Sequence, residues 1–171
     1  MEPTTNNDPV TDTDPAMAPP FAAFYSEHHE RLFRAVTLAI RDVDLASDAT
    51  DEAMARAAER WDQISAYDTP EGWVYRVALN WSRSVFRSRG RHWKRAPSIV
   101  DHDRLPDPDV NDAVARLPRQ QRIVVVARYY LDWTLADIAA ALDVPVGTVK
   151  SRLSRAQDRL TEILEAPNDA S

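Results

Sequence analysis

The sequence predicts an all-α protein made of two small helical domains joined by a linker. Apolar residues recur at intervals of three and four over most of the chain, which is the spacing of one helix face. The strict alternation of apolar and polar residues that marks a half-buried strand is missing. Residues 96–112 are rich in proline and aspartate. This composition is typical of an exposed linker and therefore indicates a domain boundary.

The first domain is expected over residues 20–95. Residues 1–19 hold many Pro, Thr and Asp residues and almost no large apolar ones, so we expect a disordered tail. The apolar spacing predicts one helix over residues 21–41 and a second over about 47–61. These helices would supply most of the core of the first domain.

A longer helix is predicted from Pro70 to about residue 89, because Thr69 followed by proline is typical of a helix start. One side of this helix is apolar. The other side carries four polar residues at intervals of four, three and four: Arg76, Asn80, Arg83 and Arg87. With Trp73 and Trp93 nearby, this face suits contacts with the backbone and bases of single-stranded nucleic acid. A solvated basic face over buried tryptophans is the alternative.

The second domain is expected over residues 113–165, with a short tail at 166–171. Helices are predicted over 109–116 and 118–131, followed by two helices that a tight turn at 143–145 separates. Thr134 and Asp137 have the spacing of a capping box at the start of the first of these two helices. The pair is therefore predicted to form a helix-turn-helix, which places its second helix in the major groove of DNA.

The second helix of this pair has an apolar and a polar side. Its predicted buried residues are Val149, Leu153, Ala156, Leu160 and Leu164. The opposite side carries the candidate DNA contacts, which are Thr148, Lys150, Ser151, Arg152 and Arg155. An ordinary amphipathic helix pair with solvated bases is the alternative that spacing alone leaves open.

The composition excludes several classes of site. The chain has no cysteine, which excludes disulfides and thiolate metal sites, and it has no glycine-rich phosphate loop. The four histidines are scattered and no Ser/His/acid set is present, so we expect no catalytic residues, no metal and no cofactor. No apolar run is long enough to cross a membrane and no signal peptide is evident, so we expect a cytoplasmic protein without membrane insertion.

The net charge of −6 is unusual for a protein that binds nucleic acid, but the charge is unevenly distributed. Residues 63–95 carry 7 basic and 2 acidic side chains, whereas residues 1–62 carry 5 basic and 13 acidic ones. At ordinary ionic strength charges act over about 10 Å, so the local balance decides contact with phosphates. The basic long helix therefore stays a candidate nucleic-acid surface.

Three stretches together resemble the extracytoplasmic-function (ECF) group of the sigma-70 family of RNA polymerase sigma factors. Residues 117–131 and 144–156 resemble region four of that family, and the second of these matches is highly specific. Residues 73–80, Trp-Val-Tyr-Arg-Val-Ala-Leu-Asn, resemble a stretch of region two. The resemblance covers about residues 20–165 and implies a dissociable factor that directs core RNA polymerase to specific promoters.

The resemblance also implies roles for the two domains. The first would grip the coiled coil of the polymerase β′ subunit and open the minus-ten element, with Arg76, Asn80, Arg83 and Arg87 along the non-template strand. The loop over about 65–72 would capture a flipped base. The second would sit on the flap of the β subunit and insert its polar helix face into the minus-thirty-five major groove. The acidic linker would follow the RNA path of the polymerase. An anti-sigma factor is a further partner that the resemblance implies.

The second helix differs from the pattern of the family at the positions expected to meet β′. The resemblance implies a polymerase contact there through Asp51, Met54, Ala55 and Glu59. Met54 and Ala55 replace a polar pair, and Ser84 stands where the family usually has Asp. Two alternatives therefore stay open: a DNA-binding regulator that acts alone, and an interaction protein that competes for polymerase or for a sigma inhibitor.

Overall fold

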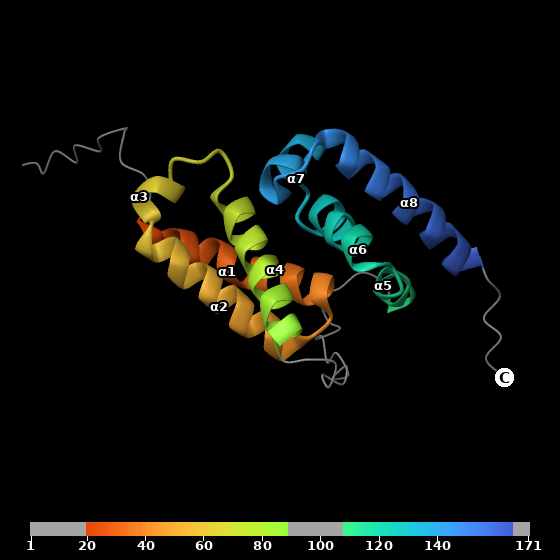
Figure 1. The fold of residues 1–171 in the computed structure, drawn as a ribbon, viewed down its shortest axis with the longest axis horizontal. Helices are drawn as coiled ribbons and strands as arrows, with labels where there is room; N and C mark the ends of the chain where they lie inside the picture. The colour runs from red at the N-terminus through yellow and green to blue at the C-terminus, as the bar shows by residue number, and fades with distance from the viewer. Residues whose placement is uncertain (1–19, 89–107, 166–171) are drawn as a thin grey trace, which may run out of the picture.

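The computed structural model describes residues 20–88 and 108–165, and every element within these ranges is helical (Figure 1). The predicted all-α fold is therefore confirmed. The expectations for the tails at 1–19 and 166–171, for Trp93 and for most of the linker lie outside the described residues. Within the described part of the chain, no helix combines the length and the apolar character needed to cross a membrane.

The N-terminal half consists of α1 (Phe21–Ile40), α2 (Val43–Glu59), the short α3 (Trp61–Ile64) and α4 (Pro70–Ser88). The first helix ends where Arg41 adopts a left-handed conformation with φ 62° and donates its N–H to the carbonyl of Thr37. The second begins four residues earlier than predicted, because the buried Asp42 carboxylate accepts a hydrogen bond of 2.9 Å from the Leu45 N–H.

The C-terminal half consists of α5 (Pro108–Ala115), α6 (Arg119–Val125), the π-helical turn η3 (Val126–Tyr130), α7 (Leu135–Leu142) and α8 (Val146–Glu165). The predicted continuous helix over 118–131 thus changes its winding after Val125. There the Leu131 N–H donates to the carbonyl of Val126, five residues earlier, at 3.1 Å.

The helix-turn-helix is present, with α7 as its first helix and α8 as its second. The predicted capping box is confirmed: the Thr134 hydroxyl accepts from the Asp137 N–H at 3.1 Å, and the Asp137 carboxylate accepts from the Thr134 N–H at 2.9 Å. The hydrogen bonds to this carboxylate also lower its pKa. The core prediction for α8 is wrong at Leu164, which is 53% exposed, because the last turns of α8 run past α5 (Figure 1).

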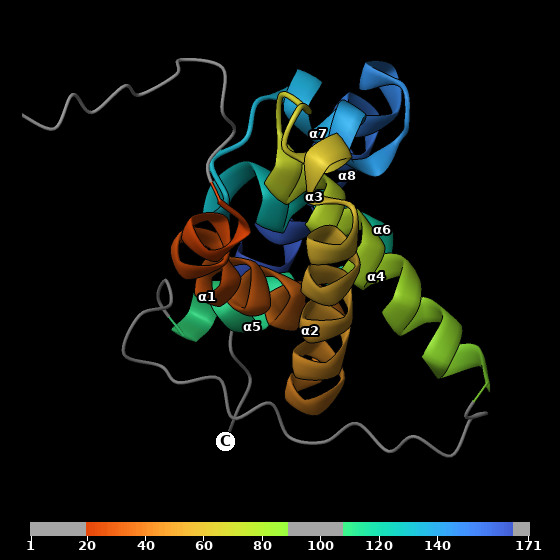
Figure 2. The ribbon, with the colours of Figure 1, turned by 90° about the vertical axis from the view of Figure 1, so that its left-hand side faces the viewer.

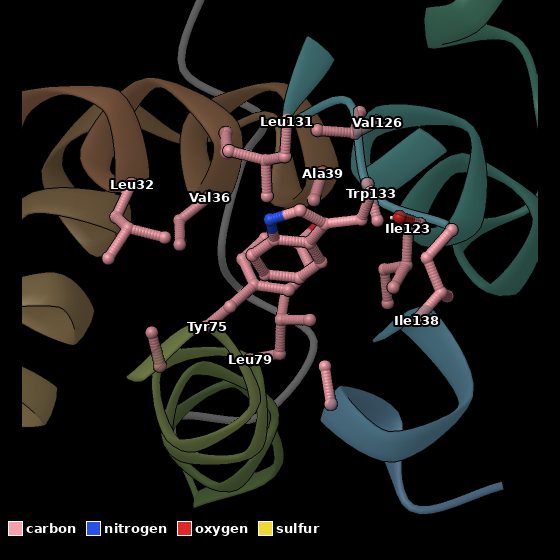
Figure 3. Packing of buried hydrophobic residues seen from close by; sticks show 14 of the residues in the cluster. Leu32, Val36, Ala39, Tyr75, Leu79, Ile123, Val126, Leu131, Trp133 and Ile138 are labelled. Carbon is pink, nitrogen blue, oxygen red and sulfur yellow. Dashed lines mark hydrogen bonds between the residues drawn. The ribbon is translucent and has the colours of Figure 1, made fainter. Parts of the chain in front are cut away.

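One hydrophobic core continues across the two halves. Figure 3 shows Tyr75 of α4 and Trp133, which precedes α7, side by side at its centre. Their rings meet edge to face with centroids 5.6 Å apart, and the Tyr75 hydroxyl donates to the carbonyl of Ile123 at 3.3 Å. Burial raises the pKa of Tyr75 far above its usual range. The phenol is therefore neutral at physiological pH and keeps this hydrogen bond.

Arginines of each half also bind backbone carbonyls of the other. Arg31 of α1 donates to the carbonyl of Leu131, just beyond η3, at 2.7 Å. In the opposite direction, Arg122 of α6 donates to the carbonyl of Ala39 in the last turn of α1, also at 2.7 Å. Carbonyls at helix ends have no partner within their own helix. Each half therefore caps a helix end of the other.

The start of α4 packs closely against α7 (Figure 2), and Gly72 makes this approach feasible. A Cβ atom at this position would lie 2.9 Å from the Cβ of Ala141 and 3.2 Å from the hydroxyl of Thr69. Two carbon atoms at 2.9 Å overlap, since their optimal separation is about 3.5–4.0 Å. No side chain fits at Gly72 while α4 and α7 keep this distance.

We predict that Gly72→Ala separates the two halves without unfolding either. Alanine favours a helix by about 1 kcal/mol over glycine, so α4 itself should tolerate the change. The added methyl group collides with Ala141 only in the packed arrangement. Small-angle X-ray scattering should show a larger radius of gyration for this variant, with helical circular dichroism unchanged.

Gly147→Ala is the matched control, because a Cβ atom at Gly147 has no neighbour within 4 Å. A second substitution, Ala141→Gly, should restore the compact form of the Gly72→Ala protein. An unchanged radius of gyration in Gly72→Ala, with the fold intact, would contradict the claim that no side chain fits at position 72 in the packed arrangement.

Candidate nucleic-acid interface

The outward face of α8 carries the first candidate set. Lys150, Ser151 and Arg155 are exposed, and Thr148 and Arg152 are half-buried. The opposite face of the helix is buried in the core through Val149, Leu153 and Ala156. The structure therefore puts all five predicted residues on or beside one accessible side of α8. The Ser151 hydroxyl donates to the carbonyl of Thr148 at 3.0 Å, so its oxygen lone pairs remain accessible to a donor.

The turn between α7 and α8 fixes the orientation of this face. Asp143 ends α7 in the left-handed conformation, with φ 55°, a geometry that aspartate tolerates better than most residues. The next residue, Val144, donates its N–H to the carbonyl of Ala139 at 3.0 Å, and Pro145 accepts from Thr148 at 2.9 Å. Both helix ends are thus satisfied by backbone hydrogen bonds within a short turn.

The second candidate set lies on α4. Asn80, Arg83 and Arg87 are exposed and Arg76 is half-buried, as the spacing predicts for one side of a helix. Arg76 also lies 4.0 Å from the carboxylate of Asp143, which is 88% exposed. A pair at this distance and exposure contributes little stability. The pair shows instead that the polar face of α4 lies next to the helix-turn-helix.

The two candidate faces border the same cavity, which the sequence did not predict. A cavity of about 230 Å³ is lined by Asn80 and Arg83 of α4 and by Arg152 of α8. The small residues Gly72 and Ala141 are the sequence signal for this close packing. A sequence does not show which of two small residues far apart along the chain pack against each other, so this contact could not be predicted.

The loop before α4 forms a third candidate feature, at the end of α4 nearest α7 (Figure 2). A cavity of about 400 Å³ is lined there by Tyr67, Thr69, Trp73 and Arg76, with Ala140 and Ala141 of α7 on its far side. Two aromatic rings and a guanidinium group are the side chains on which nucleic-acid bases stack. The packed α7 closes one side of this cavity.

The predicted polymerase contacts of α2 divide between surface and core. Asp51, Ala55 and Glu59 are exposed, and their spacing of four puts them in one stripe along the helix. The Asp51 carboxylate lies 3.0 Å from the ring of His29. Met54 is only 2% exposed, so in contrast to the prediction its side chain offers no surface to a partner. It belongs to the buried stripe formed by Thr50, Ala53, Met54 and Ala57.

Comparison with known proteins supports a common origin with sigma factors. The family described as "Sigma-70, region 4" matches residues 109–160. The ECF RNA polymerase sigma factor SigM of Mycobacterium tuberculosis is 34% identical over 155 residues, covering 84% of this chain and 76% of that protein. The RNA polymerase sigma-E factor of Streptomyces avermitilis is 30% identical over 160 residues, covering 85% and 86%.

Two solved structures share the arrangement of helices. The sigma factor RpoE of Bartonella quintana, in complex with the anti-sigma factor NepR, matches with a TM-score of 0.73 at 23% identity, covering 86% of this chain and 98% of that one. CnrH in complex with the cytosolic domain of CnrY matches with a TM-score of 0.61 at 25% identity, covering 86% and 88%. These matches and the sequence relatives span both halves of the chain. The predicted resemblance is thereby confirmed: this protein belongs to the ECF sigma factors of the sigma-70 family.

Proposed function

We propose that this protein directs core RNA polymerase to a restricted set of promoters and acts by binding and strand capture, without catalysing a reaction. The observation that carries this proposal is the pair of polar faces on α8 and α4, one in each half of a chain that belongs to the ECF sigma factors. Its substrate is promoter DNA in the cytoplasm. We also propose that residues 20–95 and 113–165 act as separate domains, with 96–112 as their linker.

In this proposal α8 recognises the minus-thirty-five element. Arg152 and Arg155 have the side chain that most often binds guanine in the major groove, because its two donors match the O6 and N7 acceptors. Lys150 would contact phosphate, while Thr148 and Ser151 supply short hydroxyls for base or backbone contacts. The capped α7, which packs against α8, holds α8 at a fixed angle to the rest of the unit.

The α4 helix and its preceding loop would bind the opened minus-ten strand. Asn80 can donate to and accept from a base edge, and Arg76, Arg83 and Arg87 can follow the phosphates. The aromatic cavity at Tyr67 and Trp73 has the chemistry to hold an extruded base.

We propose that the exposed stripe of Asp51, Ala55 and Glu59 contacts the β′ coiled coil, and that the C-terminal half contacts the β flap. Ala55 is uncharged, so the stripe holds only two charged side chains, and the buried Met54 adds no surface to it. That observation favours the second candidate function, a DNA-binding regulator without productive polymerase contact. A competitor for polymerase or for a sigma inhibitor is the third.

The packed arrangement itself cannot serve both promoter elements. By their names the elements lie about 25 base pairs apart, which is roughly 85 Å at 3.4 Å per base pair. In this structure Arg76 of the α4 face lies 4.0 Å from Asp143 of the helix-turn-helix. The halves must therefore separate before both elements are bound. The two structural relatives are complexes with anti-sigma factors, so we propose that an anti-sigma factor holds this chain in the packed form.

Run-off transcription with purified core polymerase tests the proposed function. We expect specific transcripts from a subset of promoters on addition of this protein and none without it. Sequence-specific DNA binding with no transcript at any promoter would favour the regulator that acts alone. Core binding without any DNA selectivity would favour the competitor.

The substitution Arg155→Ala should weaken recognition of the upstream element. Loss of one bidentate base contact corresponds to about 1–3 kcal/mol, or roughly a 5- to 150-fold loss of promoter affinity. Affinity for core polymerase should not change, because Arg155 faces outward from α8. Fluorescence anisotropy with promoter DNA and with core polymerase measures both; an equal loss of core affinity would contradict the assigned position.

Asn80→Ala is the complementary variant for the other face. It should slow strand opening, measured as permanganate reactivity of the minus-ten thymines, while the affinity of the closed complex stays the same. Opening at the wild-type rate and extent would remove Asn80 from the strand-binding set. Together the two variants assign the two steps to different halves.

A further inference from the structure

An acidic residue lines the aromatic cavity before α4, among side chains that are otherwise suited to nucleic acid. In the described lining of this cavity of about 400 Å³, Asp68 accompanies Tyr67, Thr69, Trp73 and Arg76. A negative charge repels the phosphates of a strand that enters the cavity, so it lowers the affinity of this surface for nucleic acid in general. Asp68 therefore does not serve unspecific strand binding.

The carboxylate of Asp68 is available to a ligand. The residue is exposed, and within residues 20–88 and 108–165 its side chain has no hydrogen-bond or ion-pair partner. The first turn of α4 is closed instead by the carbonyl of Thr69, which accepts a hydrogen bond of 3.0 Å from the Gly72 N–H. A ligand can therefore pair with Asp68 without breaking a hydrogen bond that holds the loop.

The polar and aromatic wall of this cavity belongs entirely to the N-terminal half. In the described lining, α4 and the loop before it supply every polar and every aromatic side chain, and α7 supplies only Ala140 and Ala141. Separation of the two halves therefore removes two small apolar side chains and leaves the other wall complete. That wall remains in the separated form, which the proposed function requires for promoter binding.

We infer, on the basis of the proposed strand capture, that Asp68 selects an extruded base with an exocyclic amino group. Adenine, cytosine and guanine carry such a group, whereas thymine does not. An ionised carboxylate only accepts hydrogen bonds, and an amino group offers it two donors. Thymine offers a single N–H between two carbonyl oxygens, and these oxygens repel a carboxylate. Asp68 thus disfavours thymine at the promoter position that enters the cavity.

The other side chains of the wall bind a base without making this distinction. The rings of Tyr67 and Trp73 offer stacking surfaces, and every base has a face that stacks. The hydroxyl of Thr69 both donates and accepts, so it suits either kind of base edge. Arg76 only donates, and all four bases carry acceptor atoms. Within the described lining, discrimination against thymine therefore falls to Asp68.

Fluorescence anisotropy with short DNA strands that are abasic except for one base tests this selection. The full chain bound to core polymerase should bind the dC strand about fivefold or more tighter than the dT strand, which is the size of one specific base contact. The dU strand lacks the thymine methyl group and should bind as weakly as dT. Equal affinity for dC and dU would overturn the inference but not strand capture. No binding beyond that of core polymerase alone would overturn both.

The variant Asp68→Asn assigns the preference to the carboxylate. An amide donates as well as accepts, so this protein should bind the dC and dU strands equally, and both more tightly because a negative charge is lost. Asp62→Asn is the matched control, since Asp62 is an exposed acid of α3 outside the described lining. It should keep the wild-type ratio of the dC and dU affinities. A wild-type ratio in Asp68→Asn, or an equal change in Asp62→Asn, would contradict the assignment.

Discussion

The structure depends on the burial of Tyr75 between the two halves of the chain. Its ring packs against Trp133 of the other half, and its hydroxyl donates across the boundary to Ile123. Burying a large apolar side chain contributes about 1.5–3 kcal/mol, whereas a net hydrogen bond contributes about 1 kcal/mol because water replaces it on opening. The aromatic contact therefore supplies part of the attraction, and the hydrogen bonds of Arg31, Arg119 and Arg122 across the boundary, whose donors are charged, add to it.

The same packing explains why the two candidate nucleic-acid faces lie next to each other in this structure. Contact between Gly72 and α7 brings the helix-turn-helix against the start of α4. The two nucleic-acid faces then share one cavity, and α7 forms one wall of the aromatic cavity before α4. The halves are joined by one continuous hydrophobic core, by the contact between Tyr75 and Trp133, and by arginine hydrogen bonds to backbone carbonyls.

Much of the local structure could be predicted from the sequence, because it depends on neighbouring residues. Periodicity and caps identified the long helices, the capping box at Thr134 and the outward face of α8. Contacts between residues far apart in the sequence could not be predicted. The apolar side of α4 was evident, but not that Tyr75 on that side meets Trp133 rather than a residue of its own half. The family resemblance places Met54 at the polymerase contact, but in the structure Met54 lies on the buried side of α2.

The most direct test of this account is the distance between the two halves before and during promoter binding. The chain has no cysteine, so Ala58→Cys in α2 and Asp158→Cys in α8 provide two unique, exposed sites for fluorescent labels. Single-molecule energy transfer should give one population with a short distance in the free protein. The complex with core polymerase and promoter DNA should give one population with a much longer distance. The same short distance in the transcribing complex would contradict the claim that the packed halves must separate.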